Sequence, residues 1–181
     1  MEPIDIISQY YAPGSKLFDI VVNHGRLVAK KALDAADRVS HLNCDRNFIK
    51  EAAMLHDIGI FLTAWPKLGC HGEHPYICHG YLGRDLLEKI KMPKHALVCE
   101  RHVGLGITKK EIILHHLPLP ERDMCPVSIE EQIICYADKF FSKTGKFISK
   151  EKPVKKILKR LEKYGHDKVL LFQSWVDLFT K

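Results

Sequence analysis

The stretch Ala53-Met54-Leu55-His56-Asp57-Ile58-Gly59-Ile60 constrains the fold most, because a histidine and an aspartate sit side by side in an apolar run. In a helical register Ala53, His56 and Ile60 share one face, which directs the pair toward the interior. Burying an imidazole beside a carboxylate costs free energy unless hydrogen bonds or a metal satisfy both groups. Taken alone, the pair is equally compatible with a structural pair in the core and with a metal site.

The length and composition indicate an ordinary globular protein. The chain has 181 residues, of which 46% are hydrophobic and 28% charged, so we expect a single domain over residues 1–181. The N-terminus lacks the pattern of a signal peptide, and no apolar segment approaches the roughly 20 residues that span a bilayer. We therefore expect a cytoplasmic protein without membrane contact. The six cysteines form no Cys-x-x-Cys pair, which favours buried free thiols.

Positive charge is concentrated near the C-terminus. Residues 139–168 hold eleven Lys or Arg against three Asp or Glu. Apolar residues recur at helical spacing through the same segment, as Val154, Ile157 and Leu161 show. A solvated lysine-rich face of an amphipathic helix is the favoured interpretation, and nucleic-acid binding is the less favoured one.

The periodicity of apolar residues predicts an all-α fold, a compact helical bundle, since no segment alternates as a strand does. Thr108-Lys109-Lys110-Glu111 and Ser128-Ile129-Glu130-Glu131 are capping boxes that open two of the helices. A loop over residues 63–75 contains His71, Glu73 and His74, which are candidates for substrate contact. We expect helices over residues 4–11, 15–36, 76–90, 93–104, 128–142, 152–164 and 167–180. We also expect a helix from Asp45 or Asn47 to near Gly59 and a short helical piece that begins at Thr108.

An ionisable side chain falls on the apolar face of each expected core helix. These residues are His24, His56, Asp57, His79, His102 and Asp138. A shared site for divalent metal ions explains the recurrence better than independent core hydrogen bonds, because imidazole and carboxylate are ligands for such ions. Four histidines and two carboxylates exceed the ligands of one four-coordinate zinc, which favours two metals. Asp57 is the natural bridging ligand, since it has two oxygens.

In this order, the six residues resemble the HD superfamily of metal-dependent phosphohydrolases, over roughly residues 20–142. His56-Asp57-Ile58-Gly59 resembles the His-Asp-Ile-Gly variant of its signature. His79 and His102 resemble the two extra histidines of the binuclear branch, and the chain is similar to small stand-alone prokaryotic proteins of that branch. The helices over about 152–180 lie outside the resemblance.

The resemblance implies that His24, His56, Asp57 and Asp138 hold one metal, and that Asp57, His79 and His102 hold the second. The two divalent ions would be iron, manganese or another metal, and a bridging water would be the nucleophile. The transition state also needs cations. Lys139 is therefore a candidate catalytic residue, as is Asp57. Arg101 is a candidate substrate-binding residue, as are His71 and His74.

The expected function is hydrolysis of a phosphoester or phosphoanhydride in a small phosphorylated substrate, with a nucleotide favoured. The alternative from the same resemblance is a di-iron oxygenase, because the ligand set suits iron equally well. A non-catalytic binding module is disfavoured, since none of the six ligand positions is missing. The sequence leaves the oligomeric state open.

Overall fold

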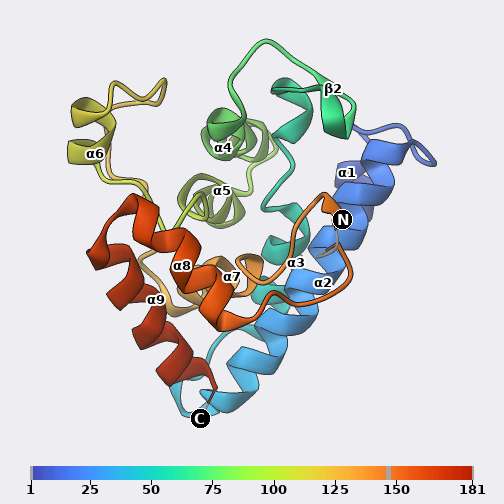
Figure 1. Ribbon diagram of the computed structural model, residues 1–181. Coiled ribbons are helices and arrows are strands. Elements are labelled where there is room, and N and C mark those ends of the chain that lie inside the picture. Colours follow the sequence, from blue (N-terminus) through green and yellow to red (C-terminus); the bar gives the residue numbers. More distant parts are fainter. Residues whose placement is uncertain (1, 146–147, 181) are drawn as a thin grey trace.

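The computed structural model describes residues 2–145 and 148–180, and these ranges are mainly helical (Figure 1). The all-α prediction is confirmed, with one small addition in the loop over residues 63–75. There, β1 (Ala64–Trp65) and β2 (Cys70–His71) form a two-residue antiparallel pair. The α-helices are α1 (Pro3–Ile7), α2 (Lys16–Arg38), α3 (Arg46–Leu55), α4 (His79–Lys89), α5 (Pro93–Arg101), α6 (Lys109–Leu114), α7 (Ile129–Asp138), α8 (Val154–Leu161) and α9 (His166–Phe179). Short 3₁₀ turns cover Ser40–Leu42, Ile60–Leu62, Pro66–Leu68, Tyr76–Cys78 and Glu162–Tyr164.

Side-chain caps start several helices, because the first amides of a helix have no partner within it. The Ser15 hydroxyl accepts from an amide in the first turn of α2, and the Asp45 carboxylate does the same for α3. At α6 the expected capping box is complete, with Thr108 and Glu111 each bonded to the other's backbone. Local sequence signals therefore fix these helix starts.

Several helices end earlier than the periodicity predicts, and two of these early ends lie at the cluster of His56, Asp57 and Asp138. The structure ends α3 at Leu55, so His56 follows the helix and Ile60 begins a separate 3₁₀ turn. It ends α7 at Asp138, four residues before the expected end near Ser142. Past both ends the amides bond carbonyls three residues back, as Ile58 does to Leu55 at 3.0 Å. This tighter turn rotates the backbone out of the α-helical register, so the expected face shared by His56 and Ile60 is wrong.

The buried apolar side chains form two main clusters. The larger one joins the C-terminal half of α2 to α3, α7, α8 and α9, with Phe172 and Trp175 among its members. The smaller one joins α1 and the N-terminal half of α2 to α4 and α5, with Ile6 and Leu87 among its members. The long helix α2 runs past both clusters (Figure 1). Its middle, where His24 lies, is therefore the place where the two halves of the core meet.

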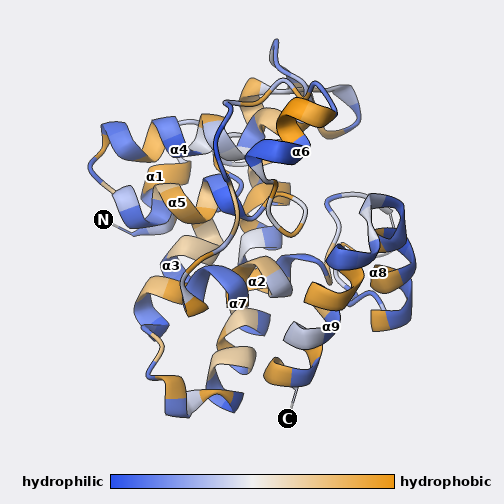
Figure 2. Cartoon of the chain, turned by 90° about the vertical axis from the view of Figure 1, so that its left-hand side faces the viewer, coloured by the Kyte–Doolittle hydropathy of each residue, from blue (hydrophilic) through white to orange (hydrophobic). Residues whose placement is uncertain are grey.

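The C-terminal helices complete the larger cluster. Figure 2 shows α8 beside α9, each with hydrophobic and hydrophilic stretches. Ile157 and Leu161 are buried, whereas Lys155 and Lys159 are exposed. The expected amphipathic helix with a lysine-rich outer face is confirmed.

The apolar character of the helices bears on whether the chain crosses a membrane. Among the described helices, none combines the length and apolar character needed to cross a membrane.

All six cysteines are free thiols, and four of them, Cys70, Cys78, Cys99 and Cys135, are buried. The expectation of buried free thiols is thus met at these four positions.

Candidate metal centre

Four histidines surround the carboxylate of Asp57, two at each oxygen. Oδ2 lies 3.3 Å from Nε2 of His24 and 3.1 Å from Nε2 of His56. Oδ1 lies 3.4 Å from Nε2 of His79 and 3.5 Å from Nε2 of His102. All five side chains are buried. The arrangement divides the imidazoles into two pairs that share one carboxylate.

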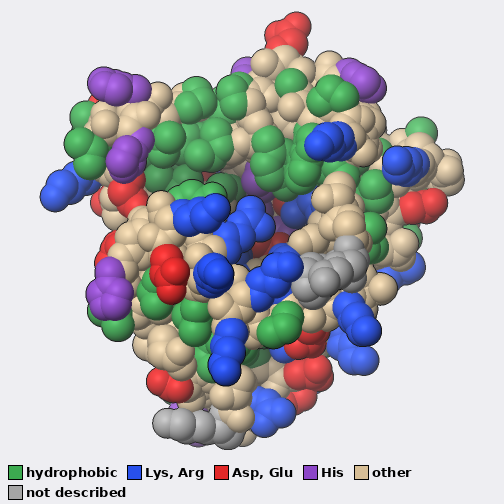
Figure 3. All heavy atoms as spheres, in the orientation of Figure 1, with side chains coloured by type: hydrophobic (Ala, Val, Ile, Leu, Met, Phe, Trp, Pro, Cys, Tyr) green, Lys and Arg blue, Asp and Glu red, His purple; other side chains and the backbone are tan. Residues whose placement is uncertain are grey.

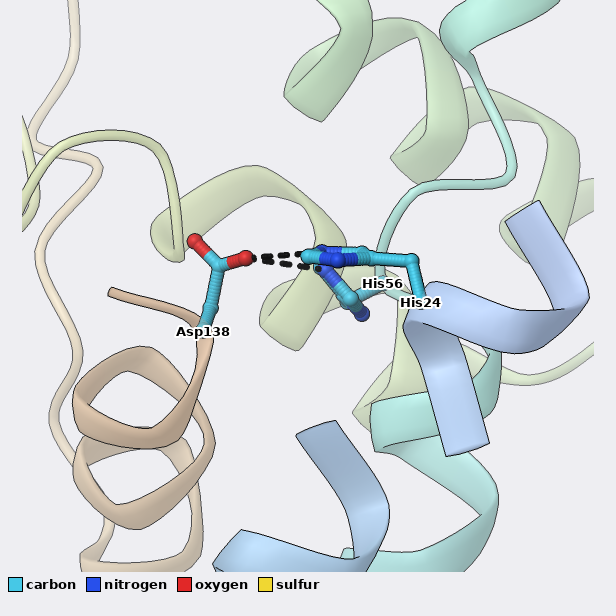
Figure 4. Close-up of side chains that lie close together, drawn as sticks. All are labelled: His24, His56 and Asp138. Carbon is cyan, nitrogen blue, oxygen red and sulfur yellow. Dashed lines mark hydrogen bonds and ion pairs between the residues drawn. The ribbon is translucent and has the colours of Figure 1, made fainter. Parts of the chain in front are cut away.

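Asp138 joins the pair at Oδ2. Its Oδ1 lies 2.9 Å from Nε2 of His24 and 3.5 Å from Nε2 of His56. Figure 4 shows the carboxylate reaching from the end of α7 toward the two rings. The donor atoms of these three residues lie within 4.8 Å of one another, as do those of His56, Asp57 and His102. The structure therefore brings together all six residues that the sequence singled out.

Backbone carbonyls fix the orientation of three of the four rings. A carbonyl oxygen can only accept, so an imidazole nitrogen bonded to it must carry the hydrogen. In its neutral form each ring then directs the lone pair of Nε2 toward Asp57, as metal-binding histidines do. Nδ1 of His56, His79 and His102 donates to the carbonyls of Ala53, Tyr76 and Cys99 at 2.6, 2.6 and 2.7 Å, respectively.

Helix ends place several of these side chains. His56 and His102 are the residues directly after α3 and α5, and Asp138 is the last residue of α7. The C-terminal end of a helix carries partial negative charge from its free carbonyls. Three such ends next to the cluster add to the two carboxylates, so the local electrostatics favour a cation.

Gly59 allows the His56-Asp57 turn to approach α4 closely. A Cβ atom added at Gly59 would lie 2.5 Å from the backbone nitrogen of Gly83 and would also clash with the carbonyl of His79. The turn is held from the other side by Tyr11, whose hydroxyl donates to the carbonyl of Ile58 at 2.8 Å. These contacts keep His79, at the start of α4, beside Asp57.

The buried polar atoms of the cluster are poorly satisfied by the protein. Nδ1 of His24, Nε2 of His56 and Oδ1 of Asp57 are buried without a hydrogen-bond partner among the described residues, and Oδ2 of Asp57 has an ion pair with Lys143 but no oriented hydrogen bond. Leaving such groups unpaired costs roughly 1–3 kcal/mol each. Imidazole nitrogens and carboxylate oxygens are ligands for borderline and hard divalent ions. The donor set therefore fits divalent metal ions, and a cation would satisfy atoms that the protein leaves unpaired.

Lys143 also reaches the cluster, although its sequence context did not single it out. Its Nζ lies 2.6 Å from Oδ2 of Asp57, and the side chain is only 10% exposed. A helix that ends at Ser142 did not indicate that the side chain of Lys143 points toward the cluster. Because α7 ends at Asp138, the chain turns back and carries Lys143 to the site. The only sequence signal was its short distance from Asp138.

Lys139 contacts the other carboxylate. Its Nζ lies 2.8 Å from Oδ2 of Asp138 and donates to the carbonyl of His102 at 3.3 Å. The structure thus places this candidate catalytic residue next to two candidate ligands.

The protonation states of the cluster follow from burial and its charges. Burial lowers the pKa of His24 to about 4 and that of His79 to about 3. Burial would also lower the pKa of His56, but the carboxylates of Asp57 and Asp138 raise it to about 9. Burial would raise the pKa of Asp57, yet His56 and Lys143 hold it well below its usual value. At neutral pH the carboxylate is ionised, and His56 carries the proton that balances part of its charge.

Three other candidate residues lie elsewhere. Nη1 of Arg101 lies 3.0 Å from both carboxylate oxygens of Glu131, so its charge is neutralised within the protein. His71 on β2 and His74 are exposed, and no contact between described residues joins either ring to the cluster. Their role as substrate contacts stays a prediction from the sequence.

The family model for the HD domain matches residues 21–143, close to the 20–142 expected. The chain belongs to the HD domain family. All six clustered residues fall within the matched segment, whereas α8 and α9 follow it.

Three relatives with known sequences are similar to this HD domain. An uncharacterized protein of Methanocaldococcus jannaschii is 35% identical over 146 residues, which cover 79% of this chain and 78% of that protein. A tRNA (cytidine(56)-2'-O)-methyltransferase of Picrophilus torridus is 34% identical over 125 residues. The corresponding methyltransferase of Thermoplasma volcanium is 29% identical over 140 residues. This chain covers only 32% and 35% of the two methyltransferases, so it corresponds to about a third of each.

Two solved structures that resemble this chain are HD domains as well. The HD domain of the phosphodiesterase PgpH of L. monocytogenes matches with a TM-score of 0.55 and 15% identity, over 96% of this chain and 94% of that one. The same domain in complex with cyclic-di-AMP gives 0.56 and 14%, over 97% and 94%. This likeness shows that the helices share the HD-domain fold over nearly the whole chain.

Proposed function

We propose that this HD domain is a metal-dependent phosphohydrolase that cleaves a phosphoester or phosphoanhydride bond, with a nucleotide as the substrate class. One observation carries the proposal. Four imidazole Nε2 atoms converge in two pairs on the two oxygens of the buried Asp57. Membership of the family of HD domains, which includes the phosphodiesterase PgpH, supports it.

Two divalent ions are proposed, one for each pair. Asp57 would contribute one oxygen to each ion and so bridge them. When bound, the two ions would activate a water as the nucleophile and neutralise the phosphate oxygens under attack. The proposed ligands are His24, His56, Asp57 and Asp138 for one ion, and Asp57, His79 and His102 for the other.

The protein supplies further positive charge around the cluster. Figure 3 shows Lys and Arg side chains gathered around a hollow on this face of the molecule. Lys139 and Lys143 reach the carboxylates, and Lys152 lies next to them, donating to the carbonyl of Lys139 at 3.0 Å. Burial lowers the pKa of Lys152 to about 8. The carboxylate of Asp138 opposes this shift, whereas the charges of Lys139 and Lys143 add to it. Such clustering of cations favours an anionic substrate and suits Lys139 to a role in stabilising the transition state.

A nucleotide is favoured over other phosphorylated molecules. The HD domain of PgpH shares the fold and has been solved with cyclic-di-AMP. A nucleotide would present its phosphate to the cations and leave its nucleoside for the walls around the cluster.

The methyltransferase relatives favour RNA as a second candidate substrate class. Two relatives that contain a segment similar to this chain are named as tRNA methyltransferases. The outer face of α8 exposes Lys155, Lys159 and Arg160, and phosphate contacts of this kind depend strongly on salt. RNA binding through α8 should weaken steeply as salt rises and should weaken in the double variant Lys155→Glu, Lys159→Glu. An affinity that responds to neither change would argue against this candidate.

A phosphate-release screen tests the leading proposal. The purified protein would be assayed on mononucleotides, cyclic nucleotides and dinucleotides with added manganese or iron, with and without oxygen. The Asp57→Asn variant is the negative control, because it loses the shared charge at nearly constant side-chain volume. Metal-dependent hydrolysis without oxygen, lost in Asp57→Asn, would support the phosphohydrolase. Turnover that strictly requires oxygen and iron would replace it with the di-iron oxygenase.

A further inference from the structure

A pocket of about 390 Å³ opens directly beside the metal-binding cluster. Its inner end is formed by His24 and Lys143, the two residues that approach Oδ2 of Asp57 from α2 and from the segment after α7. The volume lies within the range of small-molecule sites, roughly 300–1,000 Å³. A molecule whose phosphate lies at the cluster could therefore place its remaining atoms in this pocket.

One wall of the pocket is a single face of α2. Lys16, Asp19, Ile20 and Asn23 line it, at a spacing of three, four and seven residues. This spacing places their side chains in one row that leads outward from His24. At a rise of 1.5 Å per residue, the row from His24 to Lys16 extends about 12 Å along the helix, long enough for a nucleoside.

The polar side chains of this wall have no partner within residues 2–145 and 148–180. The side chains of Lys16, Asp19 and Asn23 make no hydrogen bond or ion pair with another described residue. Asn23 carries an amide that both donates and accepts, and Asp19 carries a carboxylate that accepts. These groups are therefore available to the polar edge of a ligand.

Apolar side chains line two sides of the pocket. Ile20 is partly buried on α2, and Ile148 lines the pocket from the segment after α7, together with Ser142. Flat rings bind well between such apolar side chains, because they bury area on both faces. The pocket thus combines a cationic inner end, apolar sides and free hydrogen-bonding groups.

We propose that this pocket binds the nucleoside of the substrate, with the base beside Ile20 and with Asn23 and Asp19 recognising its polar groups. The inference rests on the proposed function for the orientation of the ligand, with its phosphate toward Lys143 and the cluster. It adds candidate substrate-recognition residues to His71, His74 and Arg101, which stay predictions from the sequence. It also makes Asn23 and Asp19 specificity-determining positions, which lie outside the set of metal ligands.

Equilibrium binding tests the pocket without relying on turnover. The affinities of the metal-loaded protein for AMP, GMP, CMP and UMP would be compared by calorimetry with its affinity for ribose 5-phosphate, which lacks the base. We expect at least one nucleotide to bind about tenfold more tightly than ribose 5-phosphate, since a polar contact plus ring burial contributes on that order. The double variant Asp19→Ala, Asn23→Leu should lose this preference while binding ribose 5-phosphate as the unmodified protein does.

Matched controls separate the pocket from general effects on helices. Asp34→Ala changes an exposed aspartate on the same helix α2, and Asn47→Leu changes an exposed asparagine on α3. Both should keep the nucleotide preference. Equal binding of nucleotides and ribose 5-phosphate by the unmodified protein would overturn the inference, as would a preference that survives in the double variant.

The outcomes also distinguish this inference from the proposed function. Hydrolysis of a simple aryl phosphate without any nucleotide preference would leave the phosphohydrolase standing and remove the nucleoside pocket. Nucleotide preference that depends on Asn23 and Asp19, without metal-dependent hydrolysis of any phosphorylated compound, would keep the pocket and remove the phosphohydrolase.

Discussion

Nε2 of His79 lies 3.1 Å from Nε2 of His102, while Nδ1 of each ring donates to a backbone carbonyl. Burial lowers the pKa of both rings, which favours the neutral form. Two neutral rings in this orientation direct their Nε2 lone pairs at one another, which is unfavourable unless a cation lies nearby. This pair is therefore the strongest reason to expect a second metal ion.

The first prediction concerns metal stoichiometry. We expect about two divalent ions per chain in the intact protein and about one in His79→Ala or His102→Ala, because each removes a ligand of the second ion but none of the first. Elemental analysis of the purified proteins measures this. His41→Ala changes an exposed histidine outside the cluster and should keep two ions. One ion per chain in all four proteins would contradict the binuclear assignment.

The second prediction concerns the role of Lys143 in the metal-free protein. Lys143→Met removes the cation that lies 2.6 Å from the buried Asp57, so only the protonated His56 still balances that charge. We expect the free energy of unfolding without metal to fall by about 3 kcal/mol. Urea denaturation with a chelator measures the loss, and added manganese should restore much of it. Lys150→Met, at an exposed position, should change little, and equal stability of the two variants would refute the role.

The third prediction concerns the close approach of Gly59 to α4. Gly59→Ala inserts a methyl group against the backbone of Gly83 and His79, so the turn or the helix must shift. We expect a loss of about 2–3 kcal/mol in the free energy of unfolding. Metal content should also fall, because the shift separates His79 from Asp57. Thermal denaturation and elemental analysis test both effects. An alanine variant with unchanged stability and full metal content would show that the contact is unimportant.

The fourth prediction concerns the pH dependence of metal binding. In the metal-free protein His56 has a pKa raised to about 9, so it is protonated at pH 7, whereas burial lowers the pKa of His24 to about 4 and leaves it neutral. A metal must displace the proton of His56, so affinity should rise with pH up to about 9. We expect release of about one proton per chain on metal binding at pH 7. Calorimetry in buffers of different ionisation enthalpy counts the protons. Affinity that is flat between pH 6 and 8 would contradict the assignment.

The fifth prediction concerns Lys139. Its ammonium group contacts Asp138 but is not a metal ligand. Lys139→Ala should lower kcat about tenfold or more, because a cation that stabilises the transition state is lost, while metal content holds. The measurement is kcat together with elemental analysis. Lys155→Ala on the outer face of α8 should keep full activity. Unchanged turnover of Lys139→Ala would remove this residue from the catalytic machinery.

The sequence predicted the helices and the cluster because both depend on local patterns. Apolar spacing and caps such as Ser15 and Asp45 act within one turn of the chain, so they can be read directly. A polar residue such as His24 on an apolar stripe indicates burial by the same rule. The early ends of α3 and α7 were missed, because tertiary contacts such as that of Gly59 with α4 decide where the helical register stops.

The sequence by itself therefore determined the all-α class, the starts of the main helices and the six residues of the candidate metal centre. Only the tertiary structure decided how the four histidines divide between the two oxygens of Asp57, that Lys143 reaches the site, and that Glu131 neutralises Arg101. It also decided that one face of α2 becomes the wall of a pocket. The physical reason is distance along the chain. His24 and Asp138 are 114 positions apart, and periodicity shows that each is buried, but only the packing of whole helices determines which buried groups meet.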